Sequence, residues 1–474
     1  MKELPYDKYN PYSIEEYAKK LLNKSLRDLL QNDEALDLVI KGKGTLGQLI
    51  EEFYFFYKPN SHAGPDFPDA GLELKTTPLL NDKTKVFKAK ERLVFNIINY
   101  EEEYKRQFVD SSFWKKNQLI LLMFYLHEHE SIDIDLIFKL IRLFRFPAVD
   151  LKIIKDDWEI IKAKIKSGLA HELSEGDTFY LGACTKGANN IPTRKQPFSS
   201  ILARQRAYSL KPKYVNIIIQ KTLAGDVLVD ETEEYRRIFG STHIADPLAK
   251  YSKIGRYGTL SPIIKSIDDY REDETFEQYV IRHFEPYYGL QEDELLTKLD
   301  LKDSNAKQKA FNIAKAILKV NGKQIEEFEK AEVELKTIRL ESSGGLKESM
   351  SFPQIKFKQI VKEEWEESEL FERLSRKFFF VIFRKSKSGR PILEKVQFWN
   401  MPWNDLEKMH KIWLKTKAKI QAGDFTDFIK ISDNLIGHVR PKGTNANDLM
   451  ETELGTYEKK KAFWLSASYI KSII

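Results

Sequence analysis

An internal repeat constrains the fold of this 474-residue chain more strongly than any other feature of its sequence. Four blocks of the first half return in the second half, in the same order, at separations of 261, 257, 256 and 255 residues. They begin at Ala70, Lys90, Lys186 and Arg204, and they return at Ala331, Lys347, Lys442 and Lys459. Because four collinear blocks are hard to produce by chance, we predict two homologous domains, at residues 1–235 and 270–474, with a linker at 236–269.

Hydrophobic patterning predicts regular structure around the first blocks. Residues 14–31 and 45–57 have the periodicity of amphipathic helices. Gly71–Thr77 has the pattern of a strand, and we expect Pro78 to end that strand because proline has no backbone N–H to donate.

Two pairs of corresponding segments extend this prediction to both halves. Leu119–Leu126 and Phe378–Phe383 are apolar runs of strand length, which is typical of central strands covered on both faces. Residues 199–210 and 459–466 are expected to form helices or helix-to-strand turns. The prediction is therefore a mixed α/β domain that occurs twice in tandem.

Composition excludes several classes of protein. The longest strongly apolar run has eight residues, whereas a membrane-spanning helix needs about 20. The first residues lack the apolar stretch of a signal peptide, so we expect a cytoplasmic protein. Cys184 is the only cysteine, which excludes an internal disulfide and a cysteine-rich zinc site.

Positive charge is concentrated in one segment of the chain. The net charge is only +6, but Thr178–Gly225 contains no Asp or Glu in 48 residues, where the chain average predicts about seven. A polyanion such as DNA favours such a segment, since phosphates attract cations and repel carboxylates. A basic surface that serves only solubility is the alternative. Candidate DNA contacts are Lys186, Asn189, Arg204, Arg206 and Lys211 in the first half, and Arg440, Lys442, Lys459 and Lys461 in the second.

The chemistry is expected near the predicted strand at Gly71–Thr77. Glu73 and Lys75 are two residues apart, so their side chains point to the same face of a strand, and Asp66 precedes them in a turn. Two converging carboxylates form the oxygen-rich site that Mg²⁺ prefers, and Glu51 on the upstream helix could add a third. A neighbouring lysine can orient the attacking water and balance the charge of a phosphate. The pattern therefore predicts metal-assisted phosphodiester hydrolysis.

The chain resembles the MutH mismatch-repair nicking endonuclease and the Sau-type restriction endonucleases that cut GATC. The residues that carry this resemblance are Gly47–Glu51, Pro65-Asp66 and Gly71–Thr76. Residues 90–100, 171–175, 184–189 and 204–211 also resemble the Sau-type enzymes. The likeness covers nearly the whole chain. Its two-domain length matches the restriction enzymes, since MutH has a single such domain.

The resemblance implies a restriction-endonuclease-like fold, dependence on Mg²⁺ and a GATC target in double-stranded DNA. It implies catalytic roles for Glu51, Asp66, Glu73 and Lys75, with the three carboxylates as metal ligands, and Lys116 as a further active-site lysine. An Arg-Pro-Lys triplet is typical of the DNA-contacting segment of MutH. Here the first half has Cys184-Thr-Lys instead, and the second half keeps Arg440-Pro-Lys.

The second copy has lost part of this set. The offsets place Glu327 at the position of Asp66, and Glu334 and Lys336 at the positions of Glu73 and Lys75. The helix at residues 310–318 has no acid that matches Glu51. Because Glu is one methylene longer than Asp and Mg²⁺ geometry is strict, we expect a catalytically impaired domain that binds DNA. The alternative is a purely structural remnant.

Other classes of function remain open. Gly42-Lys-Gly-Thr-Leu-Gly47 fits the glycine pattern of a dinucleotide-binding turn, although no strand with a ribose-binding acid follows. A DNA-binding protein without catalysis and a MutH-like repair nickase are two further alternatives. We expect a type II restriction endonuclease that is a monomer in solution, pairs on DNA, and coexists with a cognate methyltransferase in its host.

Overall fold

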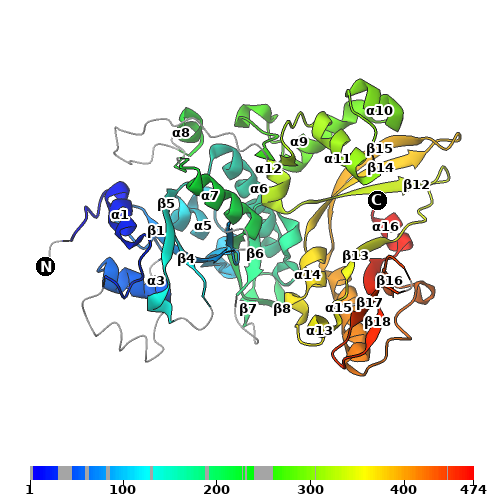
Figure 1. Cartoon of the computed structure of the whole chain (residues 1–474). Helices are drawn as coiled ribbons and strands as arrows, with labels where there is room; N and C mark the ends of the chain where they lie inside the picture. Colours follow the sequence, from blue (N-terminus) through cyan, green and yellow to red (C-terminus); the bar gives the residue numbers. More distant parts are fainter. Residues whose placement is uncertain are drawn as a thin grey trace. The chain divides into compact units, whose positions relative to one another are not determined.

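The computed structural model describes most of the chain (Figure 1). The described residues are 4–29, 45–58, 63–81, 86–128, 132–186, 192–226, 228–229, 232–239, 260–304, 306–445 and 447–474. They form two compact units, which we call unit 1 and unit 2. Unit 1 comprises Met1–His171, Thr178–Tyr270 and Gly322–Ala331, and unit 2 comprises Glu172–Asp177, Arg271–Asn321 and Glu332–Ile474. The domain boundaries inferred from the repeat stay a prediction, and part of the inferred linker, residues 240–259, lies outside the described residues.

Unit 1 is built on a mixed four-stranded sheet in the order β2-β1-β4-β5. Its strands are β1 (Glu73–Asn81), β2 (Phe87–Ala89), β4 (Ile120–Leu126) and β5 (Phe138–Phe144). β1 and β4 are parallel, and the other two pairings are antiparallel. The first five residues of β4 are buried, so the prediction of a covered central strand at Leu119–Leu126 is confirmed.

A second sheet of unit 1 has the order β3-β9-β6, and β7 pairs with β8 in a separate hairpin. These strands are β3 (Leu93–Ile97), β6 (Leu181–Thr185), β7 (Thr193–Gln196), β8 (Ser199–Arg204) and β9 (Arg206–Leu210). The helices of unit 1 include α1 (Pro11–Ala18), α3 (Leu46–Leu49), α4 (Tyr100–Glu103), α5 (Ser112–Asn117), α6 (Ala148–Lys166), α7 (Pro212–Leu223), α8 (Glu233–Phe239) and α12 (Glu326–Ala331).

Unit 2 repeats this plan with sheets in the orders β12-β14-β15 and β13-β19-β16, and with the hairpin β17-β18. The strands are β12 (Glu334–Leu340), β13 (Met350–Gln354), β14 (Lys377–Lys385), β15 (Pro391–Asn400), β16 (Gly437–Pro441), β17 (Leu449–Glu451), β18 (Tyr457–Lys459) and β19 (Lys461–Leu465). The helices include α9 (Phe276–Phe284), α10 (Glu292–Lys298), α11 (Ala306–Ile317), α13 (Phe357–Ile360), α14 (Glu369–Leu374), α15 (Trp403–Gln421) and α16 (Ala467–Ile473). β14 is the buried central strand that the sequence predicted.

Matching details confirm the duplication. In each unit the first strand runs parallel to the central strand, and Glu73 pairs with Ile120 as Glu334 pairs with Phe378. The 19-residue helices α6 and α15 each follow a proline. The hydroxyl of Tyr214 donates to a carboxylate in the first turn of α6, and the hydroxyl of Tyr469 does so for α15.

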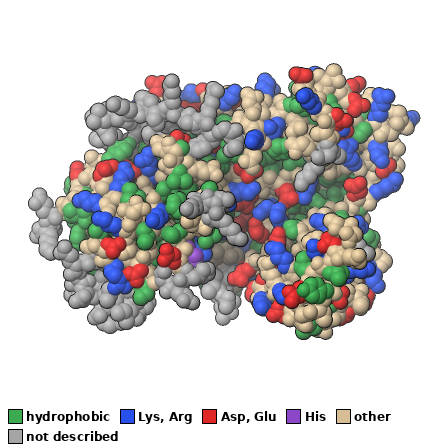
Figure 2. All heavy atoms as spheres, in the orientation of Figure 1, with side chains coloured by type: hydrophobic (Ala, Val, Ile, Leu, Met, Phe, Trp, Pro, Cys, Tyr) green, Lys and Arg blue, Asp and Glu red, His purple; other side chains and the backbone are tan. Residues whose placement is uncertain are grey.

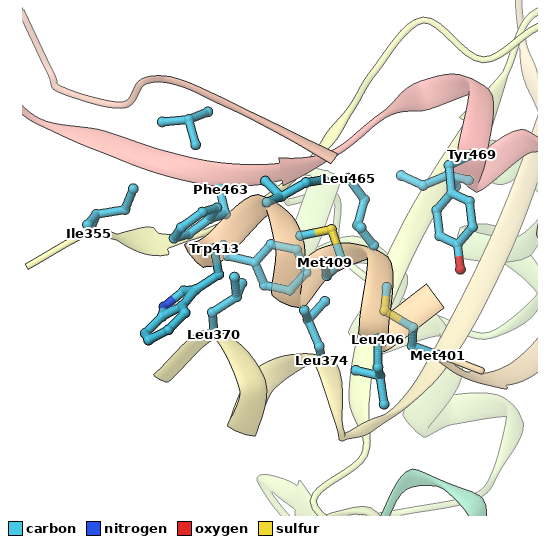
Figure 3. Close-up of a cluster of buried hydrophobic side chains, with 14 of the residues drawn as sticks. Ile355, Leu370, Leu374, Met401, Leu406, Met409, Trp413, Phe463, Leu465 and Tyr469 are labelled. Carbon is cyan, nitrogen blue, oxygen red and sulfur yellow. The ribbon is translucent and has the colours of Figure 1, made fainter. Parts of the chain in front are cut away.

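The core of unit 2 lies between α15 and its second sheet (Figure 3). Leu406, Met409 and Trp413 of α15 pack with Phe463 and Leu465 of β19 in one buried cluster. These α15 residues recur at spacings of three and four, which places them on one helical face and explains why this segment forms an amphipathic helix. No helix of the described residues is long and apolar enough to cross a membrane.

The structure corrects two predictions about element ends. β1 continues through Pro78 to Asn81, because Pro78 lies where pairing with β2 ends and the missing N–H interrupts little of that short ladder. The helix predicted at 14–31 stops much earlier, at Ala18, and a short 3₁₀ turn to Leu21 follows it.

A third prediction, of helices or helix-to-strand turns at 199–210 and 459–466, is wrong. These segments form β8 and β9 in unit 1, and the end of β18 with β19 in unit 2. Buried residues of β9 and β19 pair with two neighbouring strands each, so sheet pairing overrides the weak local pattern.

Candidate active site

A tight turn brings Asp66 to the start of β1. Phe67 and Leu72 exchange two backbone hydrogen bonds, and Gly71 closes the turn with φ +61°, a conformation that glycine adopts without strain. The backbone N–H of Asp66 donates to Glu73 Oε2 at 3.2 Å, and that of Leu74 donates to Asp66 Oδ2 at 3.0 Å. The two carboxylates are therefore held next to each other, as the sequence predicted.

Two lysines from different elements complete this cluster. Lys75 follows Glu73 on the same face of β1, and its Nζ lies 2.6 Å from Glu73 Oε1. Lys116 comes from the last turn of α5, and its Nζ lies 3.4 Å from Asp66 Oδ1 and 3.4 Å from Glu73 Oε1. The Glu73 side chain is fully buried, whereas Asp66 and both lysines keep 17–22% of their side-chain surface exposed. The cluster is thus open on one side.

Glu51 enters from the helix before the turn. It lies in η2 (Ile50–Tyr54), a π-helical turn that continues α3, and such turns are frequent at functional sites. α3 contacts β1, and the charges of Asp66 and Glu73 act on Glu51. The helix predicted at 45–57 therefore exists in part, and it brings Glu51 to the acidic cluster.

Burial and neighbouring carboxylates raise the pKa of Glu51 and Glu73. Burial is the main cause that raises the pKa of Glu73 to about 7; Asp66 adds to this rise, while Lys75 and Lys116 oppose it. Burial and the charges of Asp66 and Glu73 raise the pKa of Glu51 to about 7. Burial lowers the pKa of Lys116, but Glu73 and Asp66 outweigh it, so that pKa is raised. The site favours an added positive charge.

The carboxylate set fits a hard divalent cation. Aspartate and glutamate oxygens are the ligands that Mg²⁺ prefers, and a bound cation would offset both the burial and the smaller carboxylate repulsion that raise the pKa of Glu51 and Glu73. Within the described residues, no group of three or more His, Cys, Asp or Glu side chains is already arranged around one point. The ammonium of Lys116 lies between Asp66 and Glu73 and supplies positive charge there.

The corresponding place in unit 2 has the opposite electrostatic character. Glu334 and Lys336 begin β12 as Glu73 and Lys75 begin β1, with 2.7 Å between Nζ and Oε1. Burial raises the pKa of Glu334, but Lys336, Arg373 and Arg376 outweigh it, so this pKa is lowered. Ser111 caps the N-terminus of α5 and Ser368 caps that of α14. Aligning the two helices on these serines places Arg373 at the position of Lys116.

The placement of Glu327 corrects the alignment by offset. Glu327 lies on helix α12 of unit 1, and its carboxylate accepts hydrogen bonds from the backbone N–H groups of Ile263 and Ile264. It is not in a turn before β12, and it is buried, so it is not a counterpart of Asp66. The predicted absence of an acid in the helix at 310–318 holds for α11, which contacts β12.

The candidate DNA contacts differ in exposure. Lys186, Arg440 and Lys459 are exposed, and Arg204, Lys442 and Lys461 are half-buried. Arg440 stacks over Trp464 at 4.0 Å, and Lys442 Nζ donates to the carbonyl of Phe352. Asn189 lies outside the described residues. On the face drawn in Figure 2, Lys and Arg side chains are interspersed with Asp and Glu side chains.

Two of these candidates are buried. Arg206 donates to the carbonyl of Ala183 at 2.7 Å, and Lys211 donates to that of Ala331 at 2.8 Å. Because both charged groups are buried and donate to backbone carbonyls of unit 1, neither Arg206 nor Lys211 is exposed for the predicted DNA contact. A basic side chain in an acid-free segment is not surface-exposed by that fact alone.

Two kinds of residue could not be predicted from the sequence motifs. They are the arginines that lower the pKa of Glu334, and the buried Glu103, which accepts a hydrogen bond from the backbone N–H of Ser112 at the start of α5. Arg373 and Arg376 follow no motif, but the alignment of Ser111 with Ser368 before two short helices could have revealed Arg373. Glu103 is fully buried and has no motif of its own. Its signal in the sequence is the replacement of a charged residue by Ile360 in the second copy.

Comparison with known proteins agrees with this geometry. A profile of the family described as "DNA mismatch repair enzyme MutH" matches residues 55–157 and 317–411, which contain β1 and β12. The chain is similar to the "Type II restriction enzyme Sau3AI" of Staphylococcus aureus, with 32% identity over 513 positions that cover 97% of each chain. The chain therefore belongs to the family of MutH-like and Sau-type enzymes, which are site-specific endonucleases.

Proposed function

We propose that this chain is a Mg²⁺-dependent type II restriction endonuclease that hydrolyses double-stranded DNA at GATC. The observation that carries the proposal is the cluster of Asp66, Glu73, Lys75 and Lys116 at the start of β1, with Glu51 beside it. Similarity over 97% of the chain to a type II restriction enzyme supports a restriction function. The GATC target rests on the resemblance to the Sau-type enzymes.

Each residue of the cluster has a distinct task in this proposal. Asp66, Glu73 and Glu51 would hold the metal, which would supply Lewis-acid chemistry by polarising the scissile phosphate and acidifying water. Lys75 orients the attacking water beside Glu73. Lys116, from the other side, balances the negative charge that develops on the phosphate. Burial of Glu73 fixes the first ligand, while the exposed side of the cluster admits the DNA backbone.

A cleavage assay tests this function directly. A plasmid of known sequence is incubated with the protein, with and without Mg²⁺, and the fragment ends are sequenced. We expect linear fragments that end at GATC only in the presence of the metal. A DNA in which GATC has been methylated should resist, because the host of a restriction enzyme must protect its own sites with a methyltransferase. No cleavage of any DNA would contradict the proposal.

A repair nickase is the second candidate, because the matching family is described as a mismatch repair enzyme. The two functions differ in product: a nickase leaves open circles that persist, whereas a restriction enzyme converts circles to linear DNA. The same plasmid assay, followed over time by gel electrophoresis, distinguishes them.

For unit 2 we propose DNA binding without cleavage. Arg440 and Lys459 are exposed, and Arg440 is held over the ring of Trp464. The lowered pKa of Glu334 among Lys336, Arg373 and Arg376 supports a basic rather than a metal-binding site. The proposal predicts that an Arg440→Ala/Lys459→Ala variant loses about two units of the slope of log affinity against log salt.

A further inference from the structure

A buried carboxylate outside the acidic cluster joins several elements of unit 1. Glu103, the last residue of α4, is 1% exposed. Its Oε1 accepts hydrogen bonds from Trp158 Nε1 at 3.0 Å, from the Tyr208 hydroxyl at 3.2 Å, and from the backbone N–H of Ser112 at 3.1 Å. These donors belong to α6, β9 and the first turn of α5. A carboxylate at the N-terminus of a helix also interacts favourably with the helix dipole.

A second polar contact braces the other end of α5. Asn96 of β3 donates to the Ser112 hydroxyl at 2.9 Å and accepts from Asn117 Nδ2 at 3.1 Å. Asn117 is fully buried and follows Lys116 directly in the chain. We call Asn96, Glu103, Ser112, Asn117 and Tyr208 the α5 brace. It holds both ends of the six-residue helix that carries Lys116.

Unit 2 has the same elements without the brace. The repeat and the aligned helices place Pro353, Ile360, Glu369, Leu374 and Phe463 at the positions of the five brace residues. Leu374, Trp413 and Phe463 belong to one apolar cluster (Figure 3). α14, β19 and α15 form there as α5, β9 and α6 form in unit 1. The fold therefore does not require the polar groups.

The copy that has the α5 brace is also the copy in which the helix directs a lysine to two carboxylates. In unit 1 the braced helix directs Lys116 to Asp66 and Glu73. In unit 2 the unbraced helix presents Arg373, which lies 3.7 Å from Glu334; its other ion pair, at 3.9 Å, is with Glu369 one turn earlier on α14 itself. Buried polar groups lose hydration and are stabilising only when fully paired, so apolar packing is the simpler solution where only the fold matters.

We propose that Glu103 and Asn96 are positioning residues that fix α5 so that Lys116 reaches the reacting phosphate. This inference rests on the proposed endonuclease function. Neither residue touches the substrate. The six-residue helix is too short to hold its place by its own hydrogen bonds, so its contacts with neighbouring elements set the position of Lys116.

The test transfers the residues of unit 2 into unit 1. The Glu103→Ile/Tyr208→Phe variant keeps a combination that packs in the second copy, while Glu103→Gln keeps an acceptor for the three donors. Single-turnover cleavage of a GATC duplex is measured at saturating protein and Mg²⁺, and binding of the same duplex is measured in Ca²⁺. We expect the swap to slow cleavage about 10- to 100-fold with little change in binding, and Glu103→Gln to recover most of the rate.

A double-mutant cycle with Lys116→Ala separates positioning from general damage. If Glu103 acts through Lys116, the swap should slow the Lys116→Ala enzyme by no more than about twofold. The full factor of the swap in that background would overturn the inference, as would a swapped enzyme that cuts at the wild-type rate. Ile360→Ala in unit 2 is the matched control and should leave cleavage unchanged.

If the swapped protein fails to fold, as judged by circular dichroism, Asn117→Leu tests the same brace with the residue of unit 2. It should slow cleavage in the wild-type background and not in the Lys116→Ala background; equal slowing in both would overturn the inference. A wild-type protein that cuts no DNA would instead contradict the proposed function, so the two failures are distinguishable.

Discussion

At the scale of single residues, one oxygen of Glu73 is the meeting point of the candidate site. Oε1 forms ion pairs with both lysines: it lies 2.6 Å from Lys75 Nζ and 3.4 Å from Lys116 Nζ. Oε2 accepts a hydrogen bond from the backbone N–H of Asp66. Because Glu73 is buried and Asp66 is partly exposed, the two carboxylates are not equivalent. In the proposed function the buried Glu73 would hold the metal in a fixed position, and the more exposed Asp66 would be a second ligand.

Replacing either carboxylate should remove cleavage without removing DNA binding. Asp66→Ala and Glu73→Ala each delete a proposed metal ligand, so cleavage in Mg²⁺ should fall to the detection limit. Binding in Ca²⁺, measured by gel shift, should stay close to wild type, since the two carboxylates are proposed to bind the metal and not the DNA. Lys75→Ala should slow cleavage by about 10²–10³. Near-normal cutting by the Asp66 variant would show that the site lies elsewhere.

Protonation should control activity when the metal is limiting. The pKa values of Glu51 and Glu73 are raised from 4.5 to about 7 in the folded protein. Their protons therefore stabilise the folded state fully below pH 4.5, and this contribution is lost as the pH rises through about 7. Since Mg²⁺ must displace these protons, cleavage at low Mg²⁺ should increase between about pH 6 and 8.

The matching measurement is the Mg²⁺ concentration for half-maximal rate at each pH. It should fall as the pH rises, and the maximal rate should change less than this concentration does. A half-maximal concentration that is the same at all pH values would mean that neither carboxyl binds the metal.

At the scale of elements, α12 is joined to unit 1 by buried charges. Lys330 Nζ forms ion pairs with Asp150 of α6 at 2.8 Å and with Glu326 at 3.0 Å. Glu326 forms a second ion pair, with Lys221 of α7 at 3.2 Å. Tyr214 donates to the same Asp150 carboxylate. These groups neutralise one another where water is excluded, so removing Lys330 leaves the buried Asp150 carboxylate without a cation.

Lys330→Met should therefore destabilise the protein by roughly 3–5 kcal/mol, because it leaves the buried Asp150 carboxylate without its cation and removes one of the two cations paired with Glu326. Urea unfolding followed by tryptophan fluorescence measures this loss. Lys213→Met is the matched control: its pair with Glu329 is partly exposed, with 44% and 29% of the side chains accessible. It should cost at most about 1 kcal/mol.

Comparison of elements shows which of them could be predicted. The long apolar runs at β4 and β14 identified central strands, and the Asp66–Lys75 motif identified the start of β1, because both signals are local. For β9 and β19 the sequence predicts helices or helix-to-strand turns, since the pairing of these strands with distant strands leaves little trace in the segments themselves. The contact between Glu103 and Tyr208 spans 105 residues and has no local signal.

At the scale of the whole molecule, the proposal that only unit 1 cleaves DNA limits what a single chain can do. GATC is a palindrome with two equivalent scissile bonds, one on each strand. We expect the free protein to be a monomer and two chains to assemble around the two-fold axis of the DNA. Cleavage should then rise more steeply than in proportion to protein concentration, and a DNA with two sites should be cut faster per site than a DNA with one.

Sedimentation of the Asp66→Ala protein with a single-site duplex in Ca²⁺ measures this assembly. A strict one-to-one complex, together with nicked circles that accumulate before linear DNA, would instead indicate two successive cuts by one chain. Glu334→Ala/Lys336→Ala provides the complementary control and should leave the cutting rate almost unchanged, because Glu334 lies among the cations Lys336, Arg373 and Arg376, which disfavour a bound metal.

The two compact units do not coincide with the two halves of the chain. Glu172–Asp177 belongs to unit 2 although it lies within the first half, and Gly322–Ala331, with Lys330, belongs to unit 1 although it lies within the second. Neither half of the gene therefore encodes a complete unit. Deleting the second half of the chain would remove Lys330 and leave the buried Asp150 carboxylate without its cation, so we expect the second copy to be needed for the stability of unit 1 whether or not it cleaves DNA.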